Sequence, residues 1–320
     1  MPMGRSMHSA ISAFDSDPFL TLFFKMTFDR VRDEIDEFVA CFHSNNEEIN
    51  EYNASVFKGY PNYRYKIVTG IGELGIALDE IYPLVQGDRL MVIDSDNYVL
   101  KKGVIKKFFQ ELDIFSAIGS GGNCVQPLEL ARDIASRSGF GYARINTFMA
   151  FFDKLKLDKL NSTFRRKFYR TGDVIEPINY RVNLEGLPQN KMCLDTMGLL
   201  SLVYAKEYGR IKLIECRDPN LEWIHMGGLS SMSNRFLDGG NNHSIMGVAQ
   251  QGGRFDFKFN KWRLAIHLFI YEMTVDKCPL KDFNKKYIDS LNKKIIQSGF
   301  TRDDLENDLN NLKAIWAQPA

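Results

Sequence analysis

The sequence predicts an α/β protein in which helices flank a mainly parallel central sheet and a helical extension follows at the C-terminus. Strand-like and helix-like hydrophobic patterns alternate through about the first 120 residues, as they do in parallel sheets. Residues 90–93 are four apolar residues in succession, which is typical of a strand buried on both faces of a sheet. From Trp262 onward, apolar residues recur at helical spacing.

The predicted elements at the amino end begin after a loose tail over residues 1–17. Residues 19–24 form an apolar run that we expect to be the first strand. Apolar side chains then recur at helical spacing over residues 31–42, which predicts an amphipathic helix. A second strand is expected over residues 65–70, where glycine ends the run.

The pattern then continues to the end of the first half. A helix-like run over residues 74–84 leads into the apolar strand at 90–93. Residues 103–112 are again helical in pattern, and residues 114–118 resemble another short strand. The glycine-rich run at residues 119–123 is expected to be flexible.

The second half is predicted to contain more helix. Residues 126–170 mix apolar and basic residues at mostly helical spacing, and around residues 192–208 the pattern predicts an amphipathic helix that follows Asp195 and Thr196. Residues 210–214 predict a strand that leads to the apolar segment 222–228. The last helix is expected to be solvated, because its sequence is acidic and rich in asparagine.

Composition restricts the classes of partner and compartment. The chain has 320 residues with 41 basic and 40 acidic side chains, a net charge of +1, so no overall field attracts nucleic acid. Five cysteines without zinc-type spacing favour reduced thiols in the cytoplasm. Residues 18–26 are too few to span a membrane, which needs about 20 apolar residues. Peripheral membrane association is left open, and the sequence carries no signal for the oligomeric state.

Two carboxylates follow the apolar strand, and they are the strongest functional signal in the chain. Asp94 and Asp96 lie one residue apart directly after residues 90–93. In parallel sheets, ligands bind at the carboxyl edge, where a hard divalent cation held by carboxylates can neutralise a diphosphate. The alternative is structural: Asp94 caps the next turn and Asp96 is simply solvated.

With these residues in place, the chain resembles glycosyltransferases of the GT-A fold, a Rossmann-like nucleotide-diphospho-sugar transferase fold, and most closely glycosyltransferase family 2. Residues 19–27, the glycine-dotted segment 70–77 and the DxD-containing segment 93–99 carry the resemblance. The later segments at Asp195 and His225 extend it, so that it covers roughly residues 18–235.

The resemblance also implies a division of the chain. A nucleotide-sugar-binding half containing the DxD motif would cover residues 18–125, and an acceptor-binding half would cover residues 126–260. A helical extension would occupy residues 261–320. The implied activity is metal-dependent transfer of a sugar from a nucleotide-diphosphate sugar to a hydroxyl acceptor, which is a glycan or a lipid- or protein-linked group.

The resemblance further implies how the donor and metal are held. Asp96 would bind Mn²⁺ or Mg²⁺ directly, and Asp94 would contact the ribose or the metal. His225 would be a third metal ligand or a diphosphate contact, although a buried structural histidine is the alternative. Gly70, Glu73 and Gly227 complete the residues assigned to the nucleotide-sugar.

A catalytic base is assigned by the same resemblance. Asp195 would take the proton from the acceptor hydroxyl, as inverting transfer requires a base opposite the leaving nucleotide. Its structural alternative is an N-cap of the following helix. Asp173 and Glu176 are substitutes that the sequence does not separate from it. The basic run at residues 165–167 is expected to be a solvated helix face, with phosphate binding as the alternative.

The same segments allow three other interpretations. Gly70, Gly72 and Gly75 spell GxGxxG, but the motif does not open the first strand–helix unit of a dinucleotide-binding fold. A haloacid-dehalogenase-like phosphohydrolase also has two aspartates after a strand, but its motif requires Thr or Val where this chain has Tyr98. An inactive GT-A-like module that binds a glycan or nucleotide remains the third, and a burial-only role for Asp96 would favour it.

Overall fold

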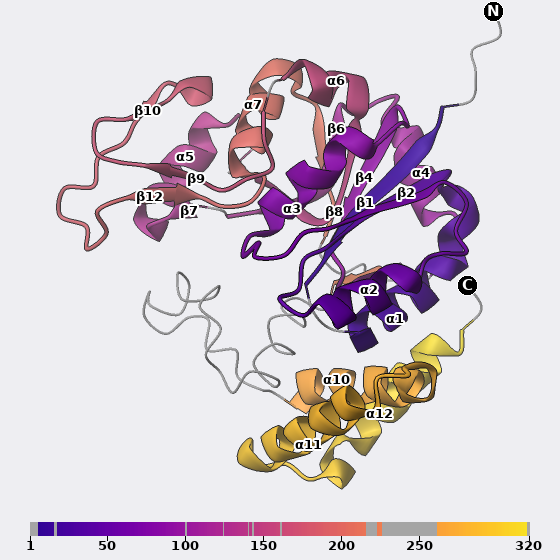
Figure 1. Cartoon of the computed structure of the whole chain (residues 1–320). Helices are drawn as coiled ribbons and strands as arrows, with labels where there is room; N and C mark the ends of the chain where they lie inside the picture. The colour runs from indigo at the N-terminus through magenta and orange to yellow at the C-terminus, as the bar shows by residue number, and fades with distance from the viewer. Residues whose placement is uncertain are drawn as a thin grey trace, which may run out of the picture.

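The computed structural model describes residues 6–15, 18–99, 101–123, 125–139, 141–142, 144–160, 162–215, 223–225 and 261–318, without the side chains of residues 224, 225 and 263. These residues form a mixed α/β structure with a mainly parallel central sheet flanked by helices, as predicted (Figure 1). The sheet has seven strands in the order β13-β6-β8-β4-β1-β2-β3. They are β1 (His8–Phe14), β2 (Glu37–Phe42), β3 (Tyr63–Ile67), β4 (Arg89–Ile93), β6 (Ala117–Gly122), β8 (Arg144–Asp153) and β13 (Ile211–Leu213).

Strand direction determines which ends meet at each edge of this sheet. Strands β1, β2, β3 and β4 pair in parallel, as do β6 and β13, whereas β8 is antiparallel to both β4 and β6. The carboxyl ends of the parallel strands therefore lie at one edge of the sheet, together with the amino end of β8.

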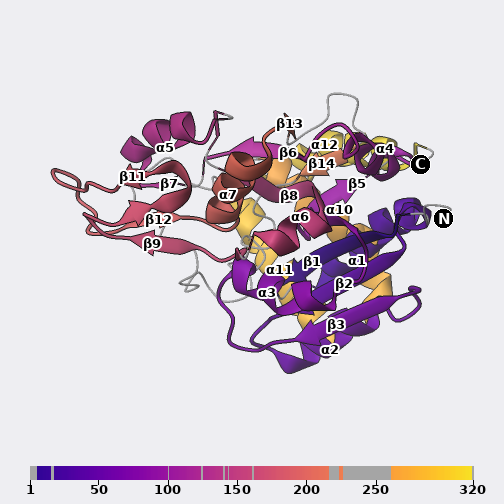
Figure 2. The same cartoon turned by 90° about the horizontal axis from the view of Figure 1, so that it is seen from above.

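Two hydrophobic clusters cover the two faces of the sheet. The side chains of β1 alternate between them, because Ala10 and Phe14 enter one cluster while Ile11 and Ala13 enter the other. The first cluster includes residues of α1 (Pro18–Phe28), α2 (Glu47–Ser55), α4 (Val104–Glu111) and α10 (Lys261–Thr274). The second includes residues of α3 (Leu74–Ile81), α6 (Lys154–Lys159) and α7 (Gly198–Tyr208). Figures 1 and 2 show these helices on opposite faces of the sheet.

A second, smaller sheet projects from the central one and has a core of its own. Its strands are β7 (Val125–Gln126), β12 (Met192–Leu194) and β9 (Lys167–Tyr169), all antiparallel. Helix α5 (Ala131–Arg137) and the hairpin of β10 (Val174–Ile175) and β11 (Tyr180–Arg181) contribute residues to the same core. Figure 1 shows the hairpin at the end remote from the central sheet.

Two further strands pair beside the carboxyl edge of β4. They are β5 (Asn97–Val99) and β14 (Trp223–His225), and they run antiparallel. The C-terminal residues are helical, as predicted, in α10, α11 (Lys281–Gln297) and α12 (Arg302–Trp316). Arg30, which follows α1, contacts the last residue of α12, because its Nη2 donates to the Trp316 carbonyl at 2.6 Å. No helix among the described residues is long and apolar enough to cross a membrane.

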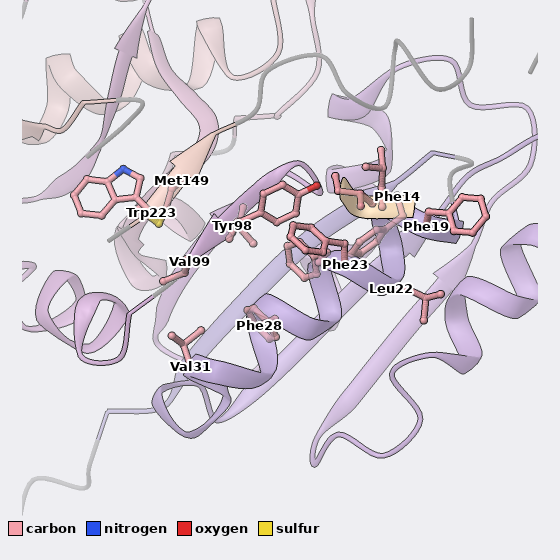
Figure 3. Close-up of a cluster of buried hydrophobic side chains, with 14 of the residues drawn as sticks. Phe14, Phe19, Leu22, Phe23, Phe28, Val31, Tyr98, Val99, Met149 and Trp223 are labelled. Atoms are coloured by element: carbon pink, nitrogen blue, oxygen red, sulfur yellow. The ribbon is translucent and has the colours of Figure 1, made fainter. Parts of the chain in front are cut away.

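The expected tail and first strand are wrong. Residues 8–14 of the supposed tail form β1, which pairs with β2 on one side and β4 on the other. The apolar run at residues 19–24 lies in helix α1, of whose 11 residues nine are buried. Figure 3 shows Phe19 and Phe23 of α1 near Phe14 of β1 and Tyr98 of β5. Because this helix is apolar on nearly all sides, the sequence shows no helical period.

The expected helix over residues 31–42 is also wrong. A 3₁₀ turn (Asp29–Glu34) precedes strand β2, and Glu37 opens that strand fully buried. The Glu37 carboxylate accepts from the Ser9 hydroxyl at 2.5 Å and pairs with Arg64 at 2.8 Å. In the sequence, a charged residue among apolar ones is read as part of the polar face of a helix. The structure shows that Glu37 is instead buried in a strand, where its charge is paired.

Three expectations for later segments need correction. Residues 119–122 are part of β6 and not a flexible loop, because β8 side chains fill the space that a Cβ would need at Gly119 and Gly122. The long strand β8 replaces much of the predicted helix over residues 126–170. In the range around residues 192–208, residues 192–194 are strand β12, and the helix that follows Asp195 and Thr196 begins at Gly198. The predicted strands β3, β4, β13 and β14 and helices α3, α4 and α7 are confirmed.

We expect Ile11→Ala to lower the free energy of unfolding by about 2–5 kcal/mol, because Ile11 is 0% exposed in the middle of the sheet. Urea denaturation measures the change, and Ile67→Ala is the control, since Ile67 is 38% exposed on edge strand β3. The control should lose less than about 1 kcal/mol. An equally small loss for Ile11→Ala would mean that residues 8–14 are a loose tail after all.

Candidate functional site

The candidate site begins where β4 leaves the sheet. Asp94 directly follows the strand, and its backbone N–H donates to the Phe148 carbonyl of β8 at 3.2 Å. The chain then turns, because the Asn97 N–H donates to the Asp94 carbonyl at 3.0 Å. As the four residues 90–93 are all buried, these are the first positions after the strand at which charge is tolerated.

The two aspartates of the motif have different surroundings. Asp94 is half-buried, and its Oδ2 accepts from the Thr147 hydroxyl at 2.9 Å. Asp96 is only 4% exposed, so the alternative that it is simply solvated is wrong. A buried carboxylate requires hydrogen bonds, an opposite charge or a metal ion to offset the loss of water. Beside it, Asn97 Oδ1 is buried without a hydrogen-bond partner in the described chain.

The structure brings the backbone of His225 to the same place. Strand β14 pairs with β5 so that His225 lies opposite Asn97, the residue that follows Asp96. The His225 side chain and the whole of Gly227 lie outside the described residues. Among the side chains that are described, no group of three or more His, Cys, Asp or Glu is arranged to hold a metal ion.

The glycine-dotted segment at residues 70–77, which leads from β3 into α3, has a packing role at Gly75. Gly70 adopts a positive φ of 77° with open space around it. Gly75 does not have this freedom, because a Cβ there would lie 2.5 Å from the Phe164 carbonyl oxygen and 2.7 Å from the Arg165 Cα. This glycine is therefore required by the close approach of protein backbone, and no ligand is needed to explain it.

Two acidic residues, one in α3 and one directly before it, hold residues 163–166 in place through hydrogen bonds. Asp79 accepts from the Phe164 N–H at 2.9 Å and from Arg165 Nε at 2.8 Å. Glu73 accepts from the Arg166 N–H. The assignment of Gly70 and Glu73 to a nucleotide-sugar stays a prediction, and Glu73 has this structural contact in addition.

Asp195 lies at the centre of an ion-pair cluster. Its Oδ1 accepts from Arg166 Nε at 3.1 Å and from the Thr196 N–H at 2.8 Å, and its Oδ2 lies 3.3 Å from Arg144 Nη1. The carboxylate is 33% exposed. It does not cap α7, whose N-cap is Met197 without a side-chain hydrogen bond. A purely structural role for Asp195 would therefore consist of its contacts with Arg144 and Arg166, and not of capping helix α7.

The basic run at residues 165–167 is not a helix face. Arg165 pairs with Asp79 and Arg166 with Asp195, while Lys167 opens strand β9. The substitute bases lie elsewhere. Asp173 is exposed in the turn before β10 and accepts from the Arg170 N–H at 2.7 Å, and Glu176 is exposed in the same hairpin. Neither joins the cluster around Asp195.

Sequence reasoning missed three side chains at this edge. Arg144 and Thr147 come from the start of β8, a strand that no sequence motif predicted. His43 follows β2, is nearly buried, and its Nδ1 lies 3.3 Å from the Ile71 carbonyl oxygen. A polar residue directly after an apolar run is the signal that could have identified His43, had residues 37–42 been recognised as a strand.

The surroundings of Cys193 show how many charges gather on one side of β12. Burial raises the pKa of its thiol to about 12, with Arg166 and Lys191 lowering it and Asp195 and Glu73 raising it. Four charged side chains therefore act on this thiol, and Glu73 among them lies far from the other three in the sequence. As the pKa is raised, Cys193 is a poor nucleophile at neutral pH.

No protein-family model and no curated protein matches the chain. Among solved structures it is similar to the mannosyltransferase PcManGT from Pyrobaculum calidifontis in complex with GDP-Man and Mn²⁺, with 12% identity and a TM-score of 0.45 over 100% of this chain and 77% of that one. TarS of S. aureus gives 14% identity and 0.41, over 97% and 53%. The galactosyltransferase LgtC with donor and acceptor sugar analogues gives 14% and 0.39, over 65% and 74%. At these values the three are similarities only and assign no activity to the chain.

Proposed function

We propose that this chain is a metal-dependent glycosyltransferase of the GT-A fold, similar to family 2, that moves a sugar from a nucleotide-diphosphate sugar to a hydroxyl acceptor. One observation carries the proposal. Asp94 and Asp96 directly follow a strand that is buried on both faces, at the carboxyl edge of a mainly parallel sheet. This is the edge at which open α/β sheets bind nucleotide ligands.

The residues at this edge are chemically suited to Mn²⁺ or Mg²⁺. Hard divalent cations prefer oxygen ligands, and the carboxylates of Asp94 and Asp96 supply them. In the proposal His225 is the third ligand. When bound, the cation neutralises the diphosphate of the leaving nucleotide.

The protein's own part is to orient the donor. The Thr147 hydroxyl donates to Asp94 Oδ2 and so orients the carboxylate that is proposed to contact the ribose or the cation. Gly70, Glu73 and Gly227 are proposed to line the nucleotide-sugar. The open space at Gly70 permits close approach of a ligand to the backbone.

Asp195 is proposed as the base that accepts the proton of the acceptor hydroxyl. A carboxylate has about four lone-pair positions, and the contacts with Arg144, Arg166 and the Thr196 N–H occupy three. The two guanidinium groups fix its orientation. Attack from the side opposite the diphosphate inverts the anomeric centre, and no covalent sugar–enzyme intermediate is required.

The first test is a calorimetric titration of UDP and of GDP into the purified chain, with and without Mn²⁺. We expect binding of one nucleotide that depends on the metal and is weakened at least about 10-fold by Asp96→Asn, because mutation of a residue that only supports a metal ligand already costs about 10–100-fold in metal affinity. Asp289→Asn, an exposed aspartate of α11, is the control and should bind as the wild type does. Metal-independent binding, or equal binding by Asp96→Asn, would contradict the proposal and favour an inactive module.

The role of Asp195 has a separate test. With an active donor and acceptor, Asp195→Asn should lower kcat by about 10²–10⁴, the usual contribution of a general base, while the Kd of the nucleotide stays unchanged. Single substitutions Asp173→Asn and Glu176→Gln are matched controls, because both residues lie in the remote hairpin. A near-normal kcat for Asp195→Asn, with either control inactive, would transfer the role to that residue.

A further inference from the structure

One face of the small sheet is uncovered by its own core. Val125, Met192 and Leu194 enter that core, so by alternation the residues between them point to the opposite side. There Cys193 is paired directly with Gln126 on one neighbour and with Phe168 on the other. We call this side the outer face. Phe168 is 52% exposed, the largest fraction of any aromatic side chain that the structure describes.

The outer face leads from Phe168 to the proposed base. Leu194 pairs with Lys167, so the next position in register joins Asp195 to Arg166, whose side chains form the 3.1 Å ion pair. In the other direction, Lys191 Nζ lies 4.5 Å from the centre of the Phe168 ring. Since a strand rises about 3.4 Å per residue, Phe168 lies about 7 Å and Lys191 about 14 Å from Asp195 along the sheet.

The charge on this face is positive. Arg144, Arg166 and Lys191 carry positive charge here, and the carboxylates of Asp195 and Glu73 carry negative charge, so three positive groups against two negative ones leave one positive charge in excess. Lys191 forms no ion pair with any carboxylate in the described part of the chain, and its contact is the Phe168 ring. A cation over an exposed aromatic ring is a weak contact when solvated, so the ammonium remains available for an anion.

Resting on the proposed function, we infer that the outer face holds the acceptor and that the acceptor is an anionic saccharide of at least two units. Its reacting hydroxyl lies at Asp195, and the next ring packs its apolar C–H face on Phe168, which removes apolar area of both from water. A phosphate or carboxylate of the saccharide pairs with Lys191. Charge complementarity distinguishes this occupant from a neutral glycan.

Binding of the labelled full-length chain to immobilised tetrasaccharides tests this inference. The probes are maltotetraose, a phosphorylated maltotetraose and tetragalacturonate, which separate a neutral, a phosphate-bearing and a carboxylate-bearing ligand. We expect binding to one anionic probe that Phe168→Ala and Lys191→Glu each weaken at least about tenfold. The matched controls Tyr65→Ala and Lys285→Glu change an exposed aromatic on β3 and an exposed lysine on α11, and should bind as the wild type does.

Each other outcome would overturn the inference. Binding to maltotetraose alone, equal binding by all variants, or no binding to any probe would exclude an anionic acceptor on this face. Self-association of the wild type that Phe168→Ala abolishes, seen by analytical ultracentrifugation, would show that a second copy covers the face. Titration of nucleotide into the same wild-type sample separates this failure from that of the proposed function, because metal-dependent nucleotide binding does not require the outer face.

Discussion

The burial of β4 on both faces is the constraint on which the proposed site depends. Strands β1 and β8 flank it, and helices cover it above and below, so residues 90–93 must be apolar. The two carboxylates of this segment, Asp94 and Asp96, therefore lie in the turn after Ile93. Because β1, β2 and β3 run in the same direction as β4, the residues that follow them reach the same edge. The fold thus concentrates polar groups there before any ligand is considered.

The antiparallel strand β8 adds a second source of side chains at that edge. Its amino end brings Thr147 to Asp94 and Arg144 to Asp195, which links the two halves of the chain. On the opposite side, α3 holds residues 163–166 through Asp79 and Glu73, and Gly75 permits the close approach. Arg166 is thereby fixed by its backbone to one half and by its side chain to Asp195. The position of the proposed base, Asp195, is therefore set by contacts with residues that are distant from it in the sequence.

The sequence identified the part of this arrangement that depends on local pattern. Strand β4, its two aspartates and the helix after Asp195 all follow from hydrophobic runs and from residue type. The errors have physical causes. Helix α1 is buried on nearly every side and therefore lacks a polar face, and β1 contains small and polar residues because Ser9 binds the buried Glu37. The ion pairs of Asp195 join residues about 30 and 50 positions apart, which no local pattern reports.

The most direct measurement is anomalous diffraction at the manganese edge from crystals grown with Mn²⁺ and the nucleotide that binds. We expect one strong peak coordinated by the Asp96 carboxylate, with the diphosphate oxygens as further ligands and Asp94 beside it. A peak remote from the turn after β4, or a nucleotide bound at this edge with no metal at Asp96, would contradict it.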